Sequence, residues 1–269
     1  MLAMMAAATQ ALLLTSARID NRALERIEAH AALDAALTRA VLGISDARLD
    51  QRWRVDGATT KFEFDGVKVG VKIQDQLGLI DLNAADGSII DQLLQSVGMP
   101  SDDAASMTDR ILDWRSDTAL KRLHGASDAD YIAAGYSYHQ RHGPFQSVAE
   151  LRLVLGMTPQ LFAKIEPALT VYSGRPALDP NLAPEQALRA LYLNAPDQVN
   201  AILRARNGTP GNDAQNGAFS GTLSPMTSIA GQTFSVGAAL ELGGRQYAQT
   251  AVVEFTGDDD RPYMVLAWQ

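Results

Sequence analysis

The amino-acid sequence predicts an α+β fold, in which a long N-terminal helix packs on an antiparallel sheet and an all-α domain is inserted between the strands of that sheet. Three observations predict it. Neither glycine nor proline interrupts residues 1–41, strand-like alternation occurs on both sides of the middle of the chain, and residues 80–167 carry short helical patterns instead. Strands divided in this way indicate an insertion rather than two domains in tandem.

The N-terminal helix, predicted over residues 1–43, begins with an apolar run. Thr9 and Gln10 are the only polar residues before Leu14, and the first charge is Arg18. If helical, this uncharged run is ~26 Å long, slightly short for a membrane span. We predict a membrane helix whose beginning is missing from this sequence, and a buried N-terminal helix is the alternative.

The second half of this helix is amphipathic and predicts burial on two sides. At 100° per residue, one narrow sector holds Leu24, Ile27, Ala31, Ala35 and Leu42, whereas Leu33 and Leu37 lie opposite.

The sheet is predicted from two stretches with a period of two residues. In the first, within residues 44–79, Phe62 and Phe64 precede an Asp65-Gly66 turn, and alternation continues to Ile73. In the second, within residues 171–269, alternation runs over 234–242, 247–255 and 263–268, which predicts a three-stranded antiparallel meander. Residues 194–224, which are rich in Asn, Gly and Pro, are predicted to form a long irregular loop.

The inserted domain, predicted over residues 80–170, contains two pairs of helices joined by glycine turns. In the clearer pair, Ser147 and Glu150 predict a capping box and a helix that ends at Gly156. Thr158 and Pro159 then begin a second helix, which ends near Pro167. Residues 81–115 have a similar form.

These pairs resemble helix-hairpin-helix units, so a DNA-binding protein is the alternative function. Such a hairpin points backbone amides at phosphate and needs nearby Lys or Arg. Neither turn, 97–100 or 155–158, contains a basic residue, and Asp102 and Asp103 follow the first. The net charge of -8 and the pI near 5.0 also argue against a polyanion as the main partner.

No motif in the sequence predicts an enzyme. The chain has neither a Gly-x-Ser-x-Gly elbow, a Walker loop, a His-Glu-x-x-His helix nor a dinucleotide fingerprint, and it has no Cys. We therefore assign no catalytic, cofactor-binding or metal residues.

Two groups of residues leave metal binding open. His124, His139 and His142, with Asp128 and Asp130, can bind a metal or can be solvated loop residues. Calcium at Asp113, Asp117, Asp128 and Asp130 is chemically reasonable, although the EF-hand spacing is missing and helix capping is the ordinary alternative. Trp114 and Tyr131 are predicted to anchor the core of the helical domain.

Five short motifs occur in a fixed order along the chain. They are DLNAA at 81–85, ILDW at 111–114, DADY at 128–131, PFQSVAEL at 144–151 and GMTP at 156–159. With the long helix before them and the strands after them, this ordered set resembles the protein K family of type II secretion systems. The resemblance runs from about residue 17 to residue 268. Residues 178–184 depart from the family pattern, and so does the start, which lacks a basic leader and a prepilin cleavage motif.

The resemblance implies a pilin-like fold and a structural role as a minor pseudopilin, without enzyme activity. It implies a subunit at or near the tip of a pseudopilus, assembled with other minor pseudopilins. It further implies a single-pass anchor in the inner membrane, with most of the chain in the periplasm, and no nucleic-acid partner. Some members of the family bind calcium in the helical domain.

Overall fold

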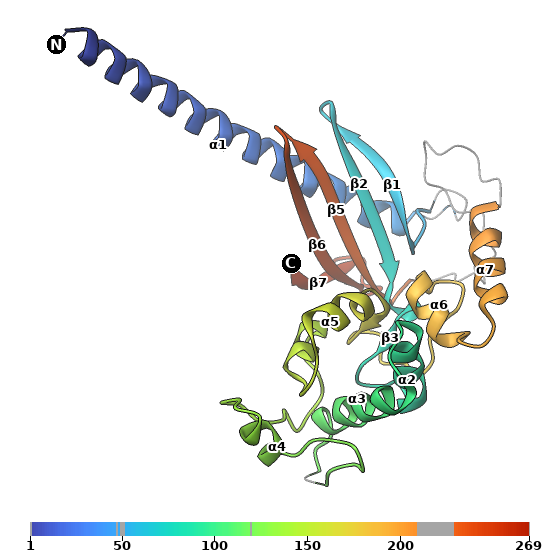
Figure 1. Ribbon diagram of the computed structural model, residues 1–269. Coiled ribbons are helices and arrows are strands. Elements are labelled where there is room, and N and C mark those ends of the chain that lie inside the picture. The colour runs from blue at the N-terminus through green and yellow to red at the C-terminus, as the bar shows by residue number, and fades with distance from the viewer. Residues whose placement is uncertain (1, 47, 49–51, 119, 209–228, 269) are drawn as a thin grey trace.

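The computed structural model describes the backbone of residues 2–46, 48, 52–118, 120–208 and 229–268, and their side chains except those of residues 2–21, 207 and 208. Within these ranges, a five-stranded antiparallel sheet lies beside the C-terminal half of helix α1 (Leu2–Ile44), and a helical region lies at one end of the sheet (Figure 1). The strands are β1 (Asp56–Phe64), β2 (Val67–Asp75), β5 (Thr233–Leu242), β6 (Arg245–Phe255) and β7 (Tyr263–Trp268), in the order β1-β2-β5-β6-β7.

The two tight hairpins of the sheet, β1–β2 and β5–β6, each turn on two residues with positive φ. Asp65 and Gly66 join β1 to β2, with φ of 48° and 79°, and Gly243 and Gly244 join β5 to β6, with φ of 59° and 73°. Two-residue turns of this kind match the right-handed twist of the strands. The structure thus has strands where alternation predicts them.

Helix α1 packs on the sheet through a face rich in alanine. Ala29, Leu33 and Leu37 are buried against β2, β5 and β6. Small side chains let the helix axis approach the sheet closely, which decides the packing face. The opposite sector does not pack on the chain, because Leu24 and Ile27 are each 63% exposed. The prediction of burial on two sides is therefore wrong for the subunit by itself.

The helical region has its own hydrophobic core. It contains α2 (Gly87–Ser96), α3 (Ser101–Trp114), α4 (Asp128–Ala133), α5 (Pro159–Ile165), α6 (Glu185–Leu191) and α7 (Pro196–Gly208). Helix α2 contacts both α3 and α6. Trp114 and Tyr131 are fully buried with ring centroids 5.7 Å apart, in the core position that the sequence predicts. Burial raises the pKa of Tyr131 to about 12, and its hydroxyl accepts a hydrogen bond from the Leu155 backbone N–H at 3.0 Å.

The helix predicted from Ser147 is instead a 3-10 helix, η3 (Val148–Leu153), and the predicted capping box is wrong. The Glu150 carboxylate accepts hydrogen bonds from Trp114 Nε1 and the Gln146 backbone N–H, both at 2.9 Å, and pairs with Arg141 at 3.1 Å. These partners draw the carboxylate away from the Ser147 backbone. Thr158 does cap α5, because its Oγ1 accepts from the Leu161 N–H at 3.1 Å.

The predicted loop over residues 194–224 is wrong in its first half, which contains helix α7. Val199 is buried, and Ile202 and Leu203 pack on the helical core, so this helix has an apolar face. The loop was predicted because Asn, Gly and Pro are frequent in and after this segment. Arg206 fixes its last turn by donating hydrogen bonds to the carbonyls of Ala183 and Pro180. The second half, from residue 209 onward, lies outside the described residues.

A buried polar junction joins the sheet to the helical region. It contains the 3-10 helix η2 (Gln76–Gly78) and the short parallel strands β3 (Ile80–Asp81) and β4 (Leu169–Thr170). Gln74 Nε2 donates to the Leu182 carbonyl at 2.8 Å, and Thr170 Oγ1 donates to Gln76 Oε1 at 2.6 Å. Strands β3 and β4 were not predicted from the sequence, since two residues are too few to show alternation.

Asp75 makes this junction sensitive to pH. Its carboxyl group is buried and accepts from the Leu77 N–H at 2.9 Å, but burial raises its pKa to about 6. The folded pKa lies above the unfolded value, so the free energy of unfolding falls as pH rises from about 4 to about 6 and stays lower above this range. We expect Asp75→Asn to raise the free energy of unfolding at pH 7.5 by about 1–3 kcal/mol, and to change it much less at pH 4.

Urea denaturation at both pH values measures this difference. The exposed turn residue Asp259 offers a control, because Asp259→Asn changes the same group without burial. An equal effect of Asp75→Asn at the two pH values would contradict the interpretation.

Candidate protein-interaction surface

Helix α1 presents a stripe of large apolar side chains that the rest of the described chain does not cover. Leu24 and Ile27 lie near its middle, and Leu42, which is 60% exposed, lies near its end. Each of these side chains leaves a large apolar area in water, which costs about 25 cal/mol per Å² relative to burial. Exposed apolar side chains grouped on one element are typical of a protein-protein contact.

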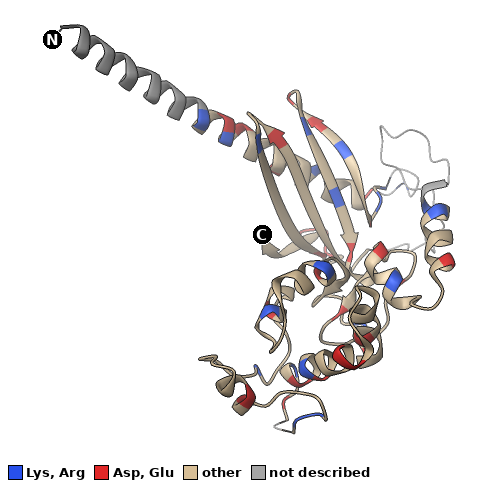
Figure 2. Ribbon diagram, viewed as in Figure 1, with Lys and Arg blue, Asp and Glu red and all other residues tan. Residues whose placement is uncertain are grey.

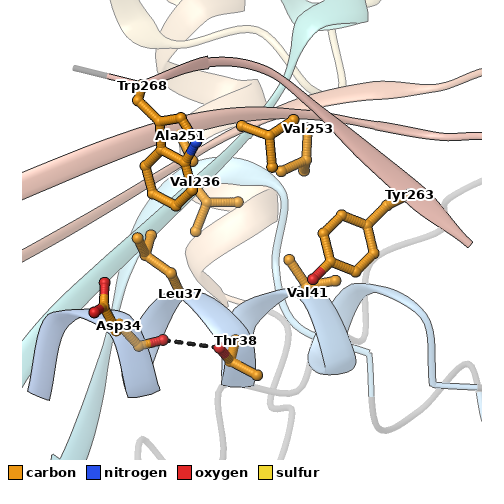
Figure 3. A pocket seen from close by; sticks show the side chains of 10 residues that line it. Asp34, Leu37, Thr38, Val41, Val236, Ala251, Val253, Tyr263 and Trp268 are labelled. Carbon is orange, nitrogen blue, oxygen red and sulfur yellow. Dashed lines mark hydrogen bonds between the residues drawn. The ribbon is translucent and has the colours of Figure 1, made fainter. Parts of the chain in front are cut away.

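A groove between α1 and the last two strands adjoins this helix (Figure 3). Leu37 and Val41 line it from α1, Val253 from β6, and Tyr263 and Trp268 from β7. Its volume of about 210 Å³ is below the roughly 300–1,000 Å³ of ordinary small-molecule sites. The groove has room for one or two side chains of another protein.

Strand β7 forms the edge of the sheet beside the groove. Its exposed apolar residues are Tyr263, Met264, Val265, Leu266 and Trp268. An edge strand with both exposed backbone groups and exposed apolar side chains pairs readily with another chain. The stripe on α1, the groove and β7 together are called the apolar surface below.

Among the described residues of the helical region, Lys and Arg do not form a basic surface. Figure 2 shows Lys and Arg interleaved with Asp and Glu along it. Gly98 and Gly156 have positive φ, as turns between helices require, but Asp102 and Asp103 occupy the first turn of α3. Arg110 lies beside the second turn and donates to the Leu155 carbonyl at 3.2 Å. The DNA-binding alternative therefore finds no support in the described residues.

The structure separates most of the residues considered for metal binding. Asp113 is buried and holds the Arg122 guanidinium at 2.7 Å, and Asp130 binds the Ser127 backbone N–H at 2.7 Å and Lys121 at 3.0 Å. Hydrogen bonds from Ser127 lower the pKa of Asp130 to about 2. Asp117 is exposed. The four acids considered for calcium do not converge.

One of these acids, Asp128, does lie close to two of the candidate histidines. Asp128, His139 and His142 each place a possible ligand atom within 4.8 Å of the other two, whereas His124 does not belong to this group. Partial burial would raise the pKa of Asp128, but hydrogen bonds from His142 and the Gln140 N–H outweigh it and lower the pKa. The short distance between the histidines in the sequence was the reason for considering them as metal ligands.

The predicted membrane segment, the uncharged run over residues 1–17, lies within residues 1–21, whose side chains are outside the description. Among the residues that are described, no helix has the length and apolar character that crossing a bilayer requires.

Comparisons with known proteins agree with the motifs. Residues 73–174 match the family model for protein K of the type II secretion system. The chain is 27% identical over 136 residues to type II secretion system protein K of Klebsiella pneumoniae, which covers 46% of this chain and 41% of that protein. It is 34% identical over 121 residues to protein K of Aeromonas hydrophila, and this alignment covers 42% of this chain and 37% of the relative. The match thus spans about two fifths of the length of these relatives.

The fold is also similar to that of a chain in the crystal structure of the GspK-GspI-GspJ complex from the enterotoxigenic Escherichia coli type 2 secretion system. The TM-score is 0.58 at 15% sequence identity, over 94% of this chain and 98% of that one. At this identity the likeness concerns the fold alone. The family resemblance predicted from the five motifs is confirmed by these matches.

Proposed function

We propose, from the premise that residues 73–174 form a protein K domain of the type II secretion system, that this chain is a minor pseudopilin. In this role it is a structural subunit at or near the tip of the pseudopilus and supports protein export across the outer membrane. The match of that domain to the family model is the observation that carries the proposal. Our proposal includes a pilin-like fold, no catalytic activity and residence in the periplasm.

The apolar surface supports assembly with other subunits. We propose that α1 packs on neighbouring subunits of the filament, so that one face of the helix binds its own sheet and the other face binds neighbours. Ala29, Leu33 and Leu37 occupy the first face, while Leu24 and Ile27 occupy the second. The partners we propose are minor pseudopilins of the GspI and GspJ types, because GspK occurs with them in the complex with the similar fold.

The position of the helical region supports a place at the tip. It lies at the end of the sheet opposite the start of α1 (Figure 1). A subunit added above this one would occupy the space that the helical region fills. In this proposal, α2 with α3, and η3 with α5, are scaffolds of a cap domain at the tip rather than DNA clamps.

Membrane anchoring is a further part of the proposal. It rests on the uncharged run over residues 1–17. We propose that this helix holds the subunit in the inner membrane before assembly and lies in the filament core afterwards.

Co-purification with tagged GspI-type and GspJ-type pseudopilins of the same secretion system tests the function. We expect the wild-type chain to associate with them. Ile27→Glu places a charge in the apolar surface and is expected to weaken association about tenfold or more, because tenfold corresponds to ~1.4 kcal/mol and a buried unpaired charge costs at least that.

Ile132→Glu is the matched control. Ile132 is 67% exposed, close to the 63% of Ile27, but it lies in α4, far from the sheet. Association should survive this change. A folded wild-type chain that does not associate with the partner pseudopilins would refute the proposed function, and equal loss in both variants would refute the assignment of the surface.

A further inference from the structure

We infer that Asp128, His139 and His142 form a binding site for one divalent transition-metal ion of the zinc class. The site lies at the start of α4, at the end of the helical region farthest from the sheet (Figure 1). It is independent of the proposed assembly surface. The inference rests on the spacing of the three ligands, the way their segments are held, and the chemistry of the donor atoms.

The spacing is close to that of a coordinated ion. His142 Nε2 lies 3.0 Å from Asp128 Oδ1, and His139 Nδ1 lies 4.0 Å from the same oxygen. Tetrahedral zinc with bonds of about 2.0–2.2 Å keeps its ligand atoms about 3.3–3.5 Å apart. The Asp128–His142 pair is therefore near the required separation, and a small rotation of the exposed His139 ring brings it into range.

A buried glutamine holds the two ligand-bearing segments together. Gln140, which lies between the histidines, donates its backbone N–H to Asp128 Oδ1 at 3.2 Å and its side-chain Nε2 to the Ala126 carbonyl at 2.5 Å. Hydrogen bonds of this kind position Asp128 before the ion arrives. His139 Nδ1 lies 2.7 Å from the Gln140 carbonyl oxygen, and it gives up this hydrogen bond when the ring turns to bind the ion.

The donor set favours a transition metal over calcium. Two imidazole nitrogens and one carboxylate suit Zn²⁺, Ni²⁺ or Cu²⁺, whereas Ca²⁺ takes six to eight oxygen ligands. Asp130, the other acid on α4, already pairs with Lys121 and Ser127. Three protein ligands leave one tetrahedral position for water.

The backbone of His142 supports a specific role for its side chain. Its φ is 55°, a conformation that residues with a Cβ adopt rarely, and this turn points Nε2 at Asp128. A glycine would adopt the turn without strain but would supply no ligand. The turn at His142 thus places its ring nitrogen beside the Asp128 carboxylate.

Isothermal titration of Zn²⁺ into the full chain, freed of metal with a chelator, tests the site. We expect one ion per chain. Loss of a group that only orients a metal ligand typically weakens binding 10–100-fold, so loss of a direct ligand in His139→Gln or His142→Gln is expected to weaken it at least about 100-fold. His124→Gln is the matched control, because His124 is an exposed histidine outside the cluster, and its titration should equal that of the wild type.

His139→Gln carries the test if His142→Gln disturbs the turn, and circular dichroism checks that each variant is folded. No Zn²⁺ binding by the folded wild type, or unchanged binding by folded His139→Gln, would overturn the inference. Tighter binding of Ca²⁺ than of Zn²⁺ at these residues would overturn the choice of metal. Neither result bears on co-purification with other pseudopilins.

Discussion

Replacing Gly78 with alanine is expected to destabilise the protein by about 3 kcal/mol or more, the upper part of the range for overpacked sites. A Cβ at this position would lie 2.3 Å from the carbonyl oxygen of Leu182 and 2.8 Å from the backbone nitrogen of Ala183. Both atoms belong to backbone, which cannot rotate away as a side chain does. The methyl group would therefore push the helical region from the end of β2, and would strain the bond between Gln74 and the Leu182 carbonyl.

Urea denaturation of the full chain measures this effect, and Gly143→Ala is the matched control. A Cβ at Gly143 meets no atom within 4 Å, and the residue does not have positive φ. The control is expected to be neutral or to stabilise by about 0.4–1 kcal/mol, because alanine restricts the unfolded chain. Equal stability of the two variants would contradict the prediction, because it would mean that the backbone around Gly78 accommodates a methyl group.

Trp114→Ala is expected to destabilise the helical region by about 3–5 kcal/mol, the usual cost of removing a large aromatic side chain from a core. The indole is 2% exposed, contacts the rings of Tyr131 and Phe145, and donates Nε1–H to Glu150 Oε1 at 2.9 Å. Its loss would leave a cavity among those rings and release Glu150, which also holds Arg141. Thermal unfolding followed by near-ultraviolet circular dichroism reports the change.

Two further variants separate packing from hydrogen bonding. Trp114→Phe keeps most of the ring volume and loses the Nε1–H donor, so we expect a cost of about 1.5–3 kcal/mol, typical of a hydrogen bond to a charged group. Trp268→Ala removes an indole that is 58% exposed on β7 and only partly buried in the groove beside α1, so it should cost less, at most about 2 kcal/mol. A loss for Trp114→Ala as small as that for Trp268→Ala would contradict the assigned core.

The sheet could be predicted from the sequence because period-two alternation and turn residues are local signals. Phe62 to Ile73 and Phe234 to Phe255 show both, and the observed strands and turns coincide with them. Alternation alone does not predict the order of the strands, since β2 pairs with β5, which follows the helical region in the chain. The prediction that the helical region is an insertion is what assigned both strands to one sheet.

The packing face of α1 could not be predicted from apolar periodicity alone. Large apolar side chains occur on both sides of the helix, Leu24 and Ile27 on one and Leu33 on the other, so side-chain size alone predicts burial of both sides. Close approach of helix and sheet favours the smaller residues. In the helical region, Glu150 binds Trp114, which lies 36 residues away in the chain. A capping rule that considers only nearby residues cannot predict this competing partner.

Of the two candidate sites, the metal cluster could be predicted from the sequence and the apolar surface could not. The meeting of His139 and His142 with Asp128 follows from short sequence distances, and the sequence identified all three residues. The apolar surface joins residues of α1 with residues of β7 at the other end of the chain. No sequence pattern links Leu37 to Trp268, so this surface was found only in the folded chain.

The interrupted sheet also sets the order in which the protein can fold. The pairing of β2 with β5 must close a loop that runs from Gln76 to Gln232, and the entropy lost on closure rises with loop length. The helical region lies within that loop, and its β3–β4 pair brings residues 80 and 169 side by side. A helical region that forms first shortens the effective loop before the central strands meet. We therefore expect β2 and β5 to pair faster once the helical region has folded, because the loop between them is then effectively shorter.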